Sequence, residues 1–318
     1  MIQLPSSLGS TNNGGLALSG DGKTLYVVLN RNNSIGIIDL TTNQLTGTIP
    51  VQNAPFGIVV ADGLAYVTNQ GGRTANPGEY TDPSSGTPIV ADAKDAFSTT
   101  GTVSVIDLRT NTVSKNIAVG LQPTAILANG GYIFVANTNS DSISVIDASK
   151  NEAITTLRIR AFEKAPFGSS PNGLAITSHG ELAVTLRANN AVALYRWDHS
   201  RGLEFEGFVP TAWYPSSVAT ASAQTAQHTG TVTSLPERLI VTNIKGTGVG
   251  SLVPNTGSPS GKNTHSFVGS VSIVRLPDHG GFQSTIARWL PTTAGIAKAS
   301  LKTMTAYPFS ASATPSST

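Results

Sequence analysis

The sequence predicts an all-β protein, and three of its features carry that prediction. Only 12% of the 318 residues are charged, against about a quarter in an average soluble domain. Long amphipathic helices need a polar or charged face, so this composition disfavours a helical bundle. The chain also contains 32 Gly, which serve tight turns, and short runs of β-branched and aromatic residues recur along it. Strands joined by turns are therefore expected throughout.

The same four short phrases recur in the same order, and each is bounded by Gly, Asn, Asp or Pro. The third phrase has the clearest copies, Ile-Ile-Asp at 37–39 and Val-Ile-Asp at 105–107 and 145–147. The last two copies lie about forty residues apart, which is the length of a four-stranded propeller blade. A β-sandwich would not repeat the same phrases in the same order. We therefore predict a β-propeller of four-stranded antiparallel blades.

Each unit is built from four predicted strands. In the first unit these are a Gly-rich strand near 14–18, then 25–30, 36–40 and 48–51. Asp-Gly pairs at 21–22 and 62–63 provide the tight turns between first and second strands. Five units are visible within a propeller region of residues 1–290, opening near residues 14, 55, 123, 171 and 215.

The two ends of the chain leave the blade number open, because five repeats fit either a closed five-bladed ring or part of a larger, about seven-bladed one. Residues 2–5 are expected to form an outermost strand. That strand would belong to a preceding blade of a longer protein, close the ring against the last blade, or pair with a neighbouring copy. Residues 291–318 are expected to form a short helix over 292–302 and a Ser/Thr/Pro-rich tail.

The phrases also resemble a known repeat. Pro-x-Gly-x-Ala, Leu-Tyr-Val-x-Asn, Val-Ser-Val-Ile-Asp and Thr-Ile-x-Val are similar to the YVTN-type β-propeller repeat of YncE-like and surface-layer-associated proteins. The likeness is good over residues 14–160 and loose over 171–220. Residues 241–246 and 269–274 resemble the last blades of bacterial YncE-family proteins. Some of those continue into a phosphoesterase domain, which is not seen in this sequence, so its metal ligands and nucleophile are not carried over.

Antiparallel strands return to the same side after every two turns, so the second-to-third connections and the blade-joining loops share one face. Two insertions, residues 70–101 and 244–268, interrupt units two and five between their second and third strands. Long loops in a compact domain are usually functional or disordered. The candidate binding residues on this loop-bearing face are Phe56, Asn69, Arg73, Gln122, Asn137, Arg187, Trp213, Tyr214, Asn243, Lys245 and His265. The alternative is that the aromatic members cap the channel by packing.

The sequence offers little chemistry for catalysis. It has no Cys, its five His lack metal-ligand spacing, and no Gly-x-Ser-x-Gly motif occurs. We predict no catalytic residue, no metal and no cofactor. Two alternatives remain for the insertions: Ca²⁺ at Asp82, Asp92 and Asp95, and a phosphate or carboxylate held by the Gly-rich loop with Lys245 and Lys262.

A net charge of +2 without a basic run does not indicate nucleic acid, and no apolar run is long enough to span a membrane. We expect a non-catalytic propeller that is secreted, periplasmic or on the cell surface, although no signal peptide is visible in this numbering. It would bind a protein or small-molecule partner on the loop-bearing face. The alternatives are a lactonase- or lyase-like propeller enzyme, and a structural protein that assembles into homo-oligomers through its N-terminal strand.

Overall fold

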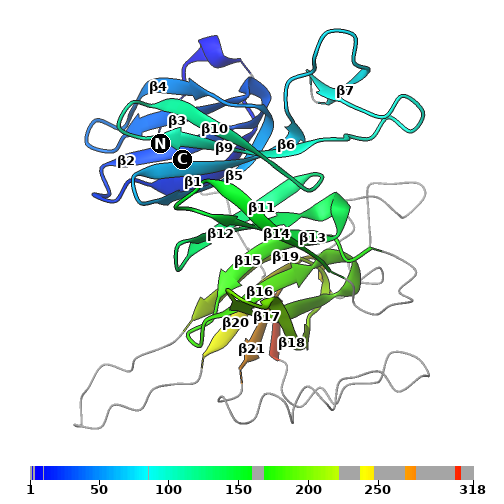
Figure 1. Ribbon diagram of the computed structural model, residues 1–318. Coiled ribbons are helices and arrows are strands. Elements are labelled where there is room, and N and C mark those ends of the chain that lie inside the picture. The colour runs from blue at the N-terminus through cyan, green and yellow to red at the C-terminus, as the bar shows by residue number, and fades with distance from the viewer. Residues whose placement is uncertain are drawn as a thin grey trace, which may run out of the picture. The chain divides into compact units, whose positions relative to one another are not determined.

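The computed structural model describes residues 2, 4–9, 11–84, 86–159, 168–221, 237–246, 269–276 and 305–308. These residues form five four-stranded antiparallel sheets, the blades of a β-propeller (Figure 1). The predicted fold class is confirmed. The helical elements within the described residues are 3-10 turns of three residues each, η1 (Ser6–Leu8), η2 (Asn30–Asn32), η3 (Thr138–Ser140) and η4 (Arg187–Asn189).

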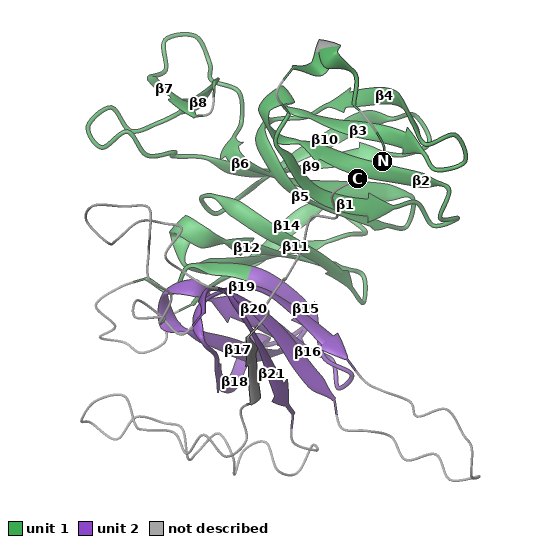
Figure 2. Cartoon of the chain, turned by 180° about the vertical axis from the view of Figure 1, so that it is seen from behind, with its two compact units in different colours: residues 1–172 green, residues 173–318 purple. Residues whose placement is uncertain are grey.

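The chain divides into two compact units, residues 1–172 and 173–318, with β15 crossing the boundary (Figure 2). The first unit holds three blades. Their strands in sheet order are β1 (Asn13–Leu18), β2 (Thr24–Leu29), β3 (Ser34–Asp39) and β4 (Gln44–Pro50); β5 (Asn53–Ala61), β6 (Leu64–Gly72), β9 (Gly101–Asp107) and β10 (Thr112–Val119); and β11 (Pro123–Asn129), β12 (Tyr132–Asn137), β13 (Ser142–Asp147) and β14 (Glu152–Arg158).

The fourth and fifth blades belong to the second unit. Their strands in sheet order are β15 (Pro171–Ile176), β16 (Glu181–Leu186), β17 (Ala191–Asp198) and β18 (Gly202–Pro210); and β19 (Trp213–Ala221), β20 (Arg238–Gly246), β21 (Ser270–Arg275) and β22 (Thr305–Pro308). The first strands of the five blades thus begin at residues 13, 53, 123, 171 and 213.

In the first four blades the second and third strands are buried along most of their length, whereas the fourth strand has many exposed positions. Every residue of β16 is buried, but β14 has exposed residues at most positions. Central strands covered on both faces must be apolar or small throughout, whereas a strand with one solvated face alternates. This difference explains why the second and third phrases were the most regular in sequence.

Side chains from neighbouring blades interlock within the first unit. Val28 and Ile35 of the first blade pack with Val67 and Ile106 of the second, and all four are fully buried. A similar cluster joins the second blade to the third, and another joins the fourth to the fifth within the second unit. Burial of apolar surface between sheets is the main stabilising contribution to such a stack.

The first strands of adjacent blades approach so closely that glycine is required. A Cβ on Gly57 would lie 2.5 Å from the carbonyl oxygen of Thr124 in the next blade, and one on Gly14 would lie 2.6 Å from that of Phe56. Carbon atoms do not approach backbone oxygens this closely, so a side chain would push the blades apart. This contact explains the Gly in the Pro-x-Gly phrase.

We define the entry end of a blade as the end where its first strand begins and its second strand ends. Strand pairing shows that these two points face each other in the blades for which both are described. The facing pairs are Asn13–Leu29, Asn53–Gly72, Pro123–Asn137 and Trp213–Gly246. The second-to-third connection of a blade and the loop that leads into it therefore lie at the same end of that blade.

The N-terminal segment does not form the predicted outermost strand. Leu4 and Pro5 lie outside strands, and residues 6–8 form the turn η1. Instead, the side chains of Ile2, Leu4 and Leu8 pack on an apolar patch of the first blade. Apolar burial therefore holds these three described residues against the first blade.

The last blade is completed from the C-terminal side of the chain. Residues 305–308 form β22, which pairs antiparallel with β21, and the Ser/Thr/Pro-rich tail that follows them lies outside the described residues. An unpaired edge of β21 would leave its backbone N–H and C=O groups unsatisfied, and β22 covers that edge. The predicted helix over 292–302 lies outside the described residues. Within the described part of the chain, no helix is long and apolar enough to cross a membrane.

Replacing Gly57 by Ala is expected to lower the free energy of unfolding by about 1–3 kcal/mol, because the new methyl group meets a neighbouring backbone oxygen. The matched control is Gly47→Ala in β4, where the nearest atom to a new Cβ is the end of Ile37, 3.9 Å away. That change should stay within about 0.5 kcal/mol. Urea denaturation measures both, and equal midpoints for the two variants would contradict the close approach of the blades.

Candidate functional site

The first insertion contains regular structure. β6 runs to Gly72, and residues 81–90 form a hairpin of β7 (Thr81–Ser84) and β8 (Thr87–Val90). The sequence of residues 71–83 is rich in turn-forming residues and indicates no regular element, but residues 71–72 belong to β6 and residues 81–83 to β7. Pro83 and Pro88 face each other across the hairpin. Because proline has no N–H to donate, these residues oppose the addition of a further strand.

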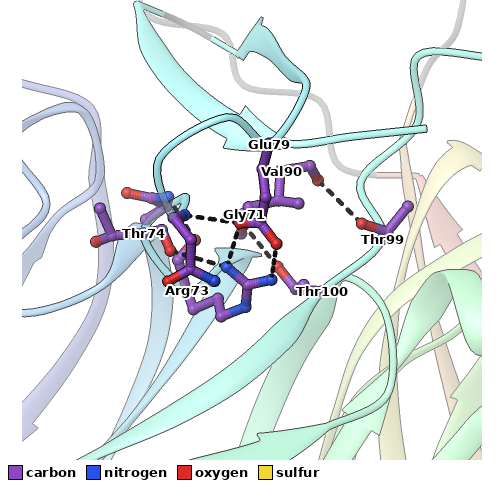
Figure 3. Close-up of polar contacts among 9 residues, drawn as sticks. Gly71, Arg73, Thr74, Glu79, Val90, Thr99 and Thr100 are labelled. Atoms are coloured by element: carbon purple, nitrogen blue, oxygen red, sulfur yellow. Dashed lines mark hydrogen bonds and ion pairs between the residues drawn. The ribbon is translucent and has the colours of Figure 1, made fainter. Parts of the chain in front are cut away.

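Arg73 closes the loop that precedes this hairpin. Its two terminal nitrogens donate to the two carboxylate oxygens of Glu79, each at 2.6 Å (Figure 3). Glu79 also accepts the amide of Asn76 at 2.7 Å, and Arg73 donates to the carbonyl of Thr74 at 3.1 Å. The Arg73 hydrogen bonds, followed by that from Asn76, lower the pKa of Glu79 to about 2. This predicted binding residue is thus engaged by its own loop.

Three predicted residues, Asn69, Asn137 and Asn243, are buried inside their sheets at the last positions of the second phrase. Asn137 donates from Nδ2 to the hydroxyls of Ser142 and Ser144 on the adjacent strand, at 3.1 and 2.9 Å. Asn69 and Asn243 make the corresponding bonds to hydroxyls of β9 and β21. These amides connect the second and third strands of a blade, so they serve the fold.

At four blade entries, the residue before proline has a left-handed backbone. These residues, with φ between 49° and 63°, are Ala54, Gln122, Ser170 and Tyr214. Only glycine adopts this conformation at low cost, and a following proline restricts the backbone further. For Ala54, Ser170 and Tyr214 this strained backbone is held by a hydrogen bond from the preceding blade. The carbonyl of Gln122 instead accepts the amide of Thr138 in η3 of its own blade, at 3.1 Å.

Asn or Asp residues at the end of the 3-10 turns supply most of these bonds. Oδ1 of Asn33 accepts the amide of Ala54 at 2.9 Å, and Oδ1 of Asp141 accepts the amide of Ser170 at 2.8 Å. Sequence analysis did not select these residues. The sequence feature that could have identified them is an Asn or Asp directly before the third strand of a blade. Asn and Asp are the residues, besides Gly, that most readily adopt a left-handed backbone.

In the second unit, one such turn brings three predicted residues together. Asn190, at the end of η4, accepts the amide of Tyr214 at 2.9 Å. The guanidinium carbon of Arg187, which begins η4, lies 5.1 Å from the centre of the Tyr214 ring. Nζ of Lys245, near the end of β20, lies 4.2 Å from the same ring centre. We call Arg187, Tyr214 and Lys245 the Tyr214 cluster.

The Tyr214 cluster lies at the entry end of the fifth blade and is accessible to solvent. All three of its side chains are partly buried, while the adjacent Trp213 is 48% exposed. Cation–π contacts of this kind contribute about 0.5–1 kcal/mol at exposed sites and more where water is excluded. Phe56, the other exposed aromatic residue among the candidates, belongs to the first unit, where it is 43% exposed in β5.

The fifth blade also borders a cavity of about 320 Å³, whose wall includes Ser216, Thr242, Asn243, Ile244 and Val271. The residues that line the cavity include none of Arg187, Tyr214 and Lys245.

Two further predictions concern the insertions: a Ca²⁺ site at Asp82, Asp92 and Asp95, and an anion site in the Gly-rich loop. Asp92 accepts the amides of Lys94 and Asp95 within a turn. Among the described residues, no group of three His, Asp or Glu side chains could hold a metal ion. His265 and the Gly-rich loop that follows residue 246 lie outside the described residues.

Comparison with known proteins supports the fold and no more. No protein-family model matches the sequence, and no curated protein matches it either. Among solved structures, the chain is similar to the hydrazine synthase of Kuenenia stuttgartiensis, with a TM-score of 0.55 and 18% sequence identity. The match covers 85% of this chain and 64% of that chain. At 18% identity this similarity concerns the fold alone. Together with the five four-stranded sheets, it shows that the chain is a β-propeller protein.

Replacing Asn137 by Ala is expected to lower the free energy of unfolding by about 1–3 kcal/mol, because two buried serine hydroxyls lose their donor. Urea denaturation measures the loss. Thr110→Ala is a suitable control, because this hydroxyl bonds only at the exposed surface. If Asn137→Ala proved as stable as the control, the amide would not hold the two strands together.

The ion pair of Glu79 predicts a specific pH dependence. Because the pKa of Glu79 is lowered from 4.5 to about 2, its pairing with Arg73 stabilises the loop above about pH 4.5 and is lost as the pH falls towards 2. In Arg73→Gln, the pKa of Glu79 should rise towards 4.5, as measured by ¹³C NMR of the carboxyl group. Asp39, whose pKa is lowered by Thr41, should titrate identically in both proteins. An unchanged Glu79 titration would contradict the pairing.

Proposed function

We propose that this protein is a non-catalytic β-propeller that binds a partner or ligand through the entry ends of its blades, and that it acts in the periplasm, outside the cell or on its surface. The location follows from the resemblance of its repeats to the YVTN type. The observation that carries the binding proposal is the Tyr214 cluster. Two residues from other elements, Arg187 and Lys245, both contact the ring of Tyr214 at an entry end, and all three were predicted as binding residues.

Two further features support binding at this surface. The blades hold their entry ends on rigid sheets, and binding residues are typically carried by loops on such a scaffold. The surface also combines exposed aromatic area, at Trp213, with partly buried polar and charged groups. Ligand sites are characteristically apolar and aromatic with a few placed polar groups.

The composition of this surface favours binding over catalysis. The described segments at the entry end of the second unit, residues 187–191, 208–216, 242–246 and 269–272, contain no His, Asp or Glu. These are the residues that most often act as general acids and bases. Assembly through an N-terminal strand is also disfavoured, because the described N-terminal residues pack as a turn on the first blade.

A fragment screen tests the proposal on the full-length protein. A set of small neutral and charged aromatic and saccharide fragments is titrated, and ¹⁵N NMR locates the responding residues. We expect the Trp213 indole and its neighbours to respond, and Trp213→Ala to remove the response. Phe205→Ala is the matched control, because Phe205 is equally exposed at 48% but lies on the outer strand β18. Responses that fall elsewhere on the protein, or survive in Trp213→Ala, would refute the proposal.

A further inference from the structure

We infer that a second copy of this protein packs its first blade against an uncovered sheet face of the fifth blade, so that copies associate head to tail. The inference goes beyond the proposed function, because it concerns the faces of two sheets and not the recognition of a ligand. It starts from a difference in burial between the fifth blade and the other four.

The apolar clusters between blades distinguish the two faces of a sheet. We call the face that packs on the following blade the front face, and the opposite one the back face. Tyr26 and Val28 of the first blade lie on its front face, because they pack in one cluster with Val67 of the second. Val67 therefore belongs to the back face of the second blade. In each of the three clusters that join blades of one unit, a front face meets a back face.

The front face is uncovered in the fifth blade alone. In the other four blades its two central positions on the second strand are buried, namely Tyr26 and Val28, Tyr66 and Thr68, Phe134 and Ala136, and Ala183 and Thr185. The corresponding residues of the fifth blade are Ile240, which is partly buried, and Thr242, which is exposed. Ile244 continues the same alternation and is 51% exposed. Leu239 and Val241 between them are fully buried against the fourth blade.

The first blade leaves part of its back face uncovered. Leu16 faces Val27 across β1 and β2, just as Ile58 faces Val67 in the second blade. Ile58 is buried against the first blade, whereas Leu16 and Leu18 are 61% and 54% exposed. Neighbouring exposed apolar side chains of this kind are typical of interaction surfaces.

The repeat itself indicates what fits on these two surfaces. One copy of the protein presents one uncovered front face and one uncovered back face, which are the two surfaces that meet wherever blades of one unit adjoin. A second copy supplies the missing counterpart of each. The contact would remove Ile244 of one copy and Leu16 and Leu18 of the other from water, which is favourable.

A hydroxyl group on the front face supports the same arrangement. In the second blade, Oγ1 of Thr68 donates at 2.9 Å to the carbonyl oxygen of Thr124, on the first strand of the third blade. Thr242 has the equivalent place in the fifth blade, and its Oγ1 lies 2.9 Å from Oγ of Ser216. A hydroxyl can accept one hydrogen bond while it donates another. In an arriving first blade, Gly14 stands where Thr124 does and offers its carbonyl oxygen to Thr242.

One side chain limits how closely two copies approach. Ser217 has the place of Gly57, since each directly precedes an apolar residue that pairs with the second strand. A Cβ at Gly57 would lie 2.5 Å from a carbonyl oxygen of the following blade. The side chain of Ser217 therefore holds an arriving blade further away than blades of one chain are held. Association between copies is accordingly weaker than packing within the chain, and reversible.

Sedimentation velocity measurements on the full chain test the inference. We expect the sedimentation coefficient to rise with protein concentration. Leu18→Glu in the first blade and Ile244→Glu in the fifth should each weaken association by at least about a hundredfold, because the contact would bury an unpaired carboxylate. Both side chains are half-exposed, so the fold is retained. The matched control Ile154→Glu alters an exposed residue of the outer strand β14 and should leave association unchanged.

A mixture of the two variants tests the head-to-tail polarity. The Leu18→Glu copy keeps an intact front face, and the Ile244→Glu copy keeps an intact back face. Their equimolar mixture should therefore form a one-to-one complex that neither variant forms alone, because a heterologous contact uses a different surface on each copy. Ser217→Gly should strengthen association by about tenfold, since it allows the closer approach.

Four results would overturn the inference: a monomer at every concentration, undiminished association in both Glu variants, a mixture that stays monomeric, or a Ser217→Gly variant that associates no more tightly than the unaltered protein. Closure of the two faces within a single chain would give the first of these results. The proposed function depends on none of them, because the fragment screen is read at Trp213 and the sedimentation measurements at the sheet faces.

Discussion

Packing of sheets against sheets within each unit is the constraint on which the rest of this structure depends. A strand covered on both faces carries mainly apolar or small side chains, as β16 does after Glu181 at its start, whereas the outer strand β14 is mostly exposed. The first strands approach each other most closely, and there even a methyl group does not fit, as at Gly14 and Gly57. The low charge and the abundance of glycine follow from this packing.

The same constraint determines how polar groups are satisfied. The buried amide Nδ2 of Asn137 donates to serine hydroxyls one strand away, because a buried donor needs an acceptor within the protein. At the sheet ends, Asn and Asp residues after the 3-10 turns bond to the amides of strained residues that open the next blade. The Tyr214 cluster lies at one of these contacts, where Asn190 accepts the amide of Tyr214, and it adds the charged side chains of Arg187 and Lys245. A structural repeat has thus placed a candidate site where its backbone is already held.

Most strands and turns of the fold could be predicted from the sequence, because they depend on local sequence patterns. Period-two alternation, Asp-Gly turns and repeated phrases follow from the chemistry of single strands and hairpins. The errors have physical causes. The hairpin of β7 and β8 depends on contacts of Asn53 with Arg73 and Pro88, which lie 20 and 35 residues away. The N-terminal apolar residues could equally have formed a strand, and only the patch they cover decided otherwise.

The sequence by itself determined the fold class, the number of visible blades and the end of each blade at which its loops lie, because these follow from alternation and from antiparallel geometry. The tertiary structure alone decided which polar residues are available to a ligand. Asn69, Asn137 and Asn243 are buried and donate from Nδ2 to hydroxyls inside their own sheets, and Arg73 pairs with Glu79. Arg187 meets Tyr214 because the fourth and fifth blades pack together, and Lys245 meets Tyr214 because β20 pairs with β19; no local pattern of the sequence contains either contact.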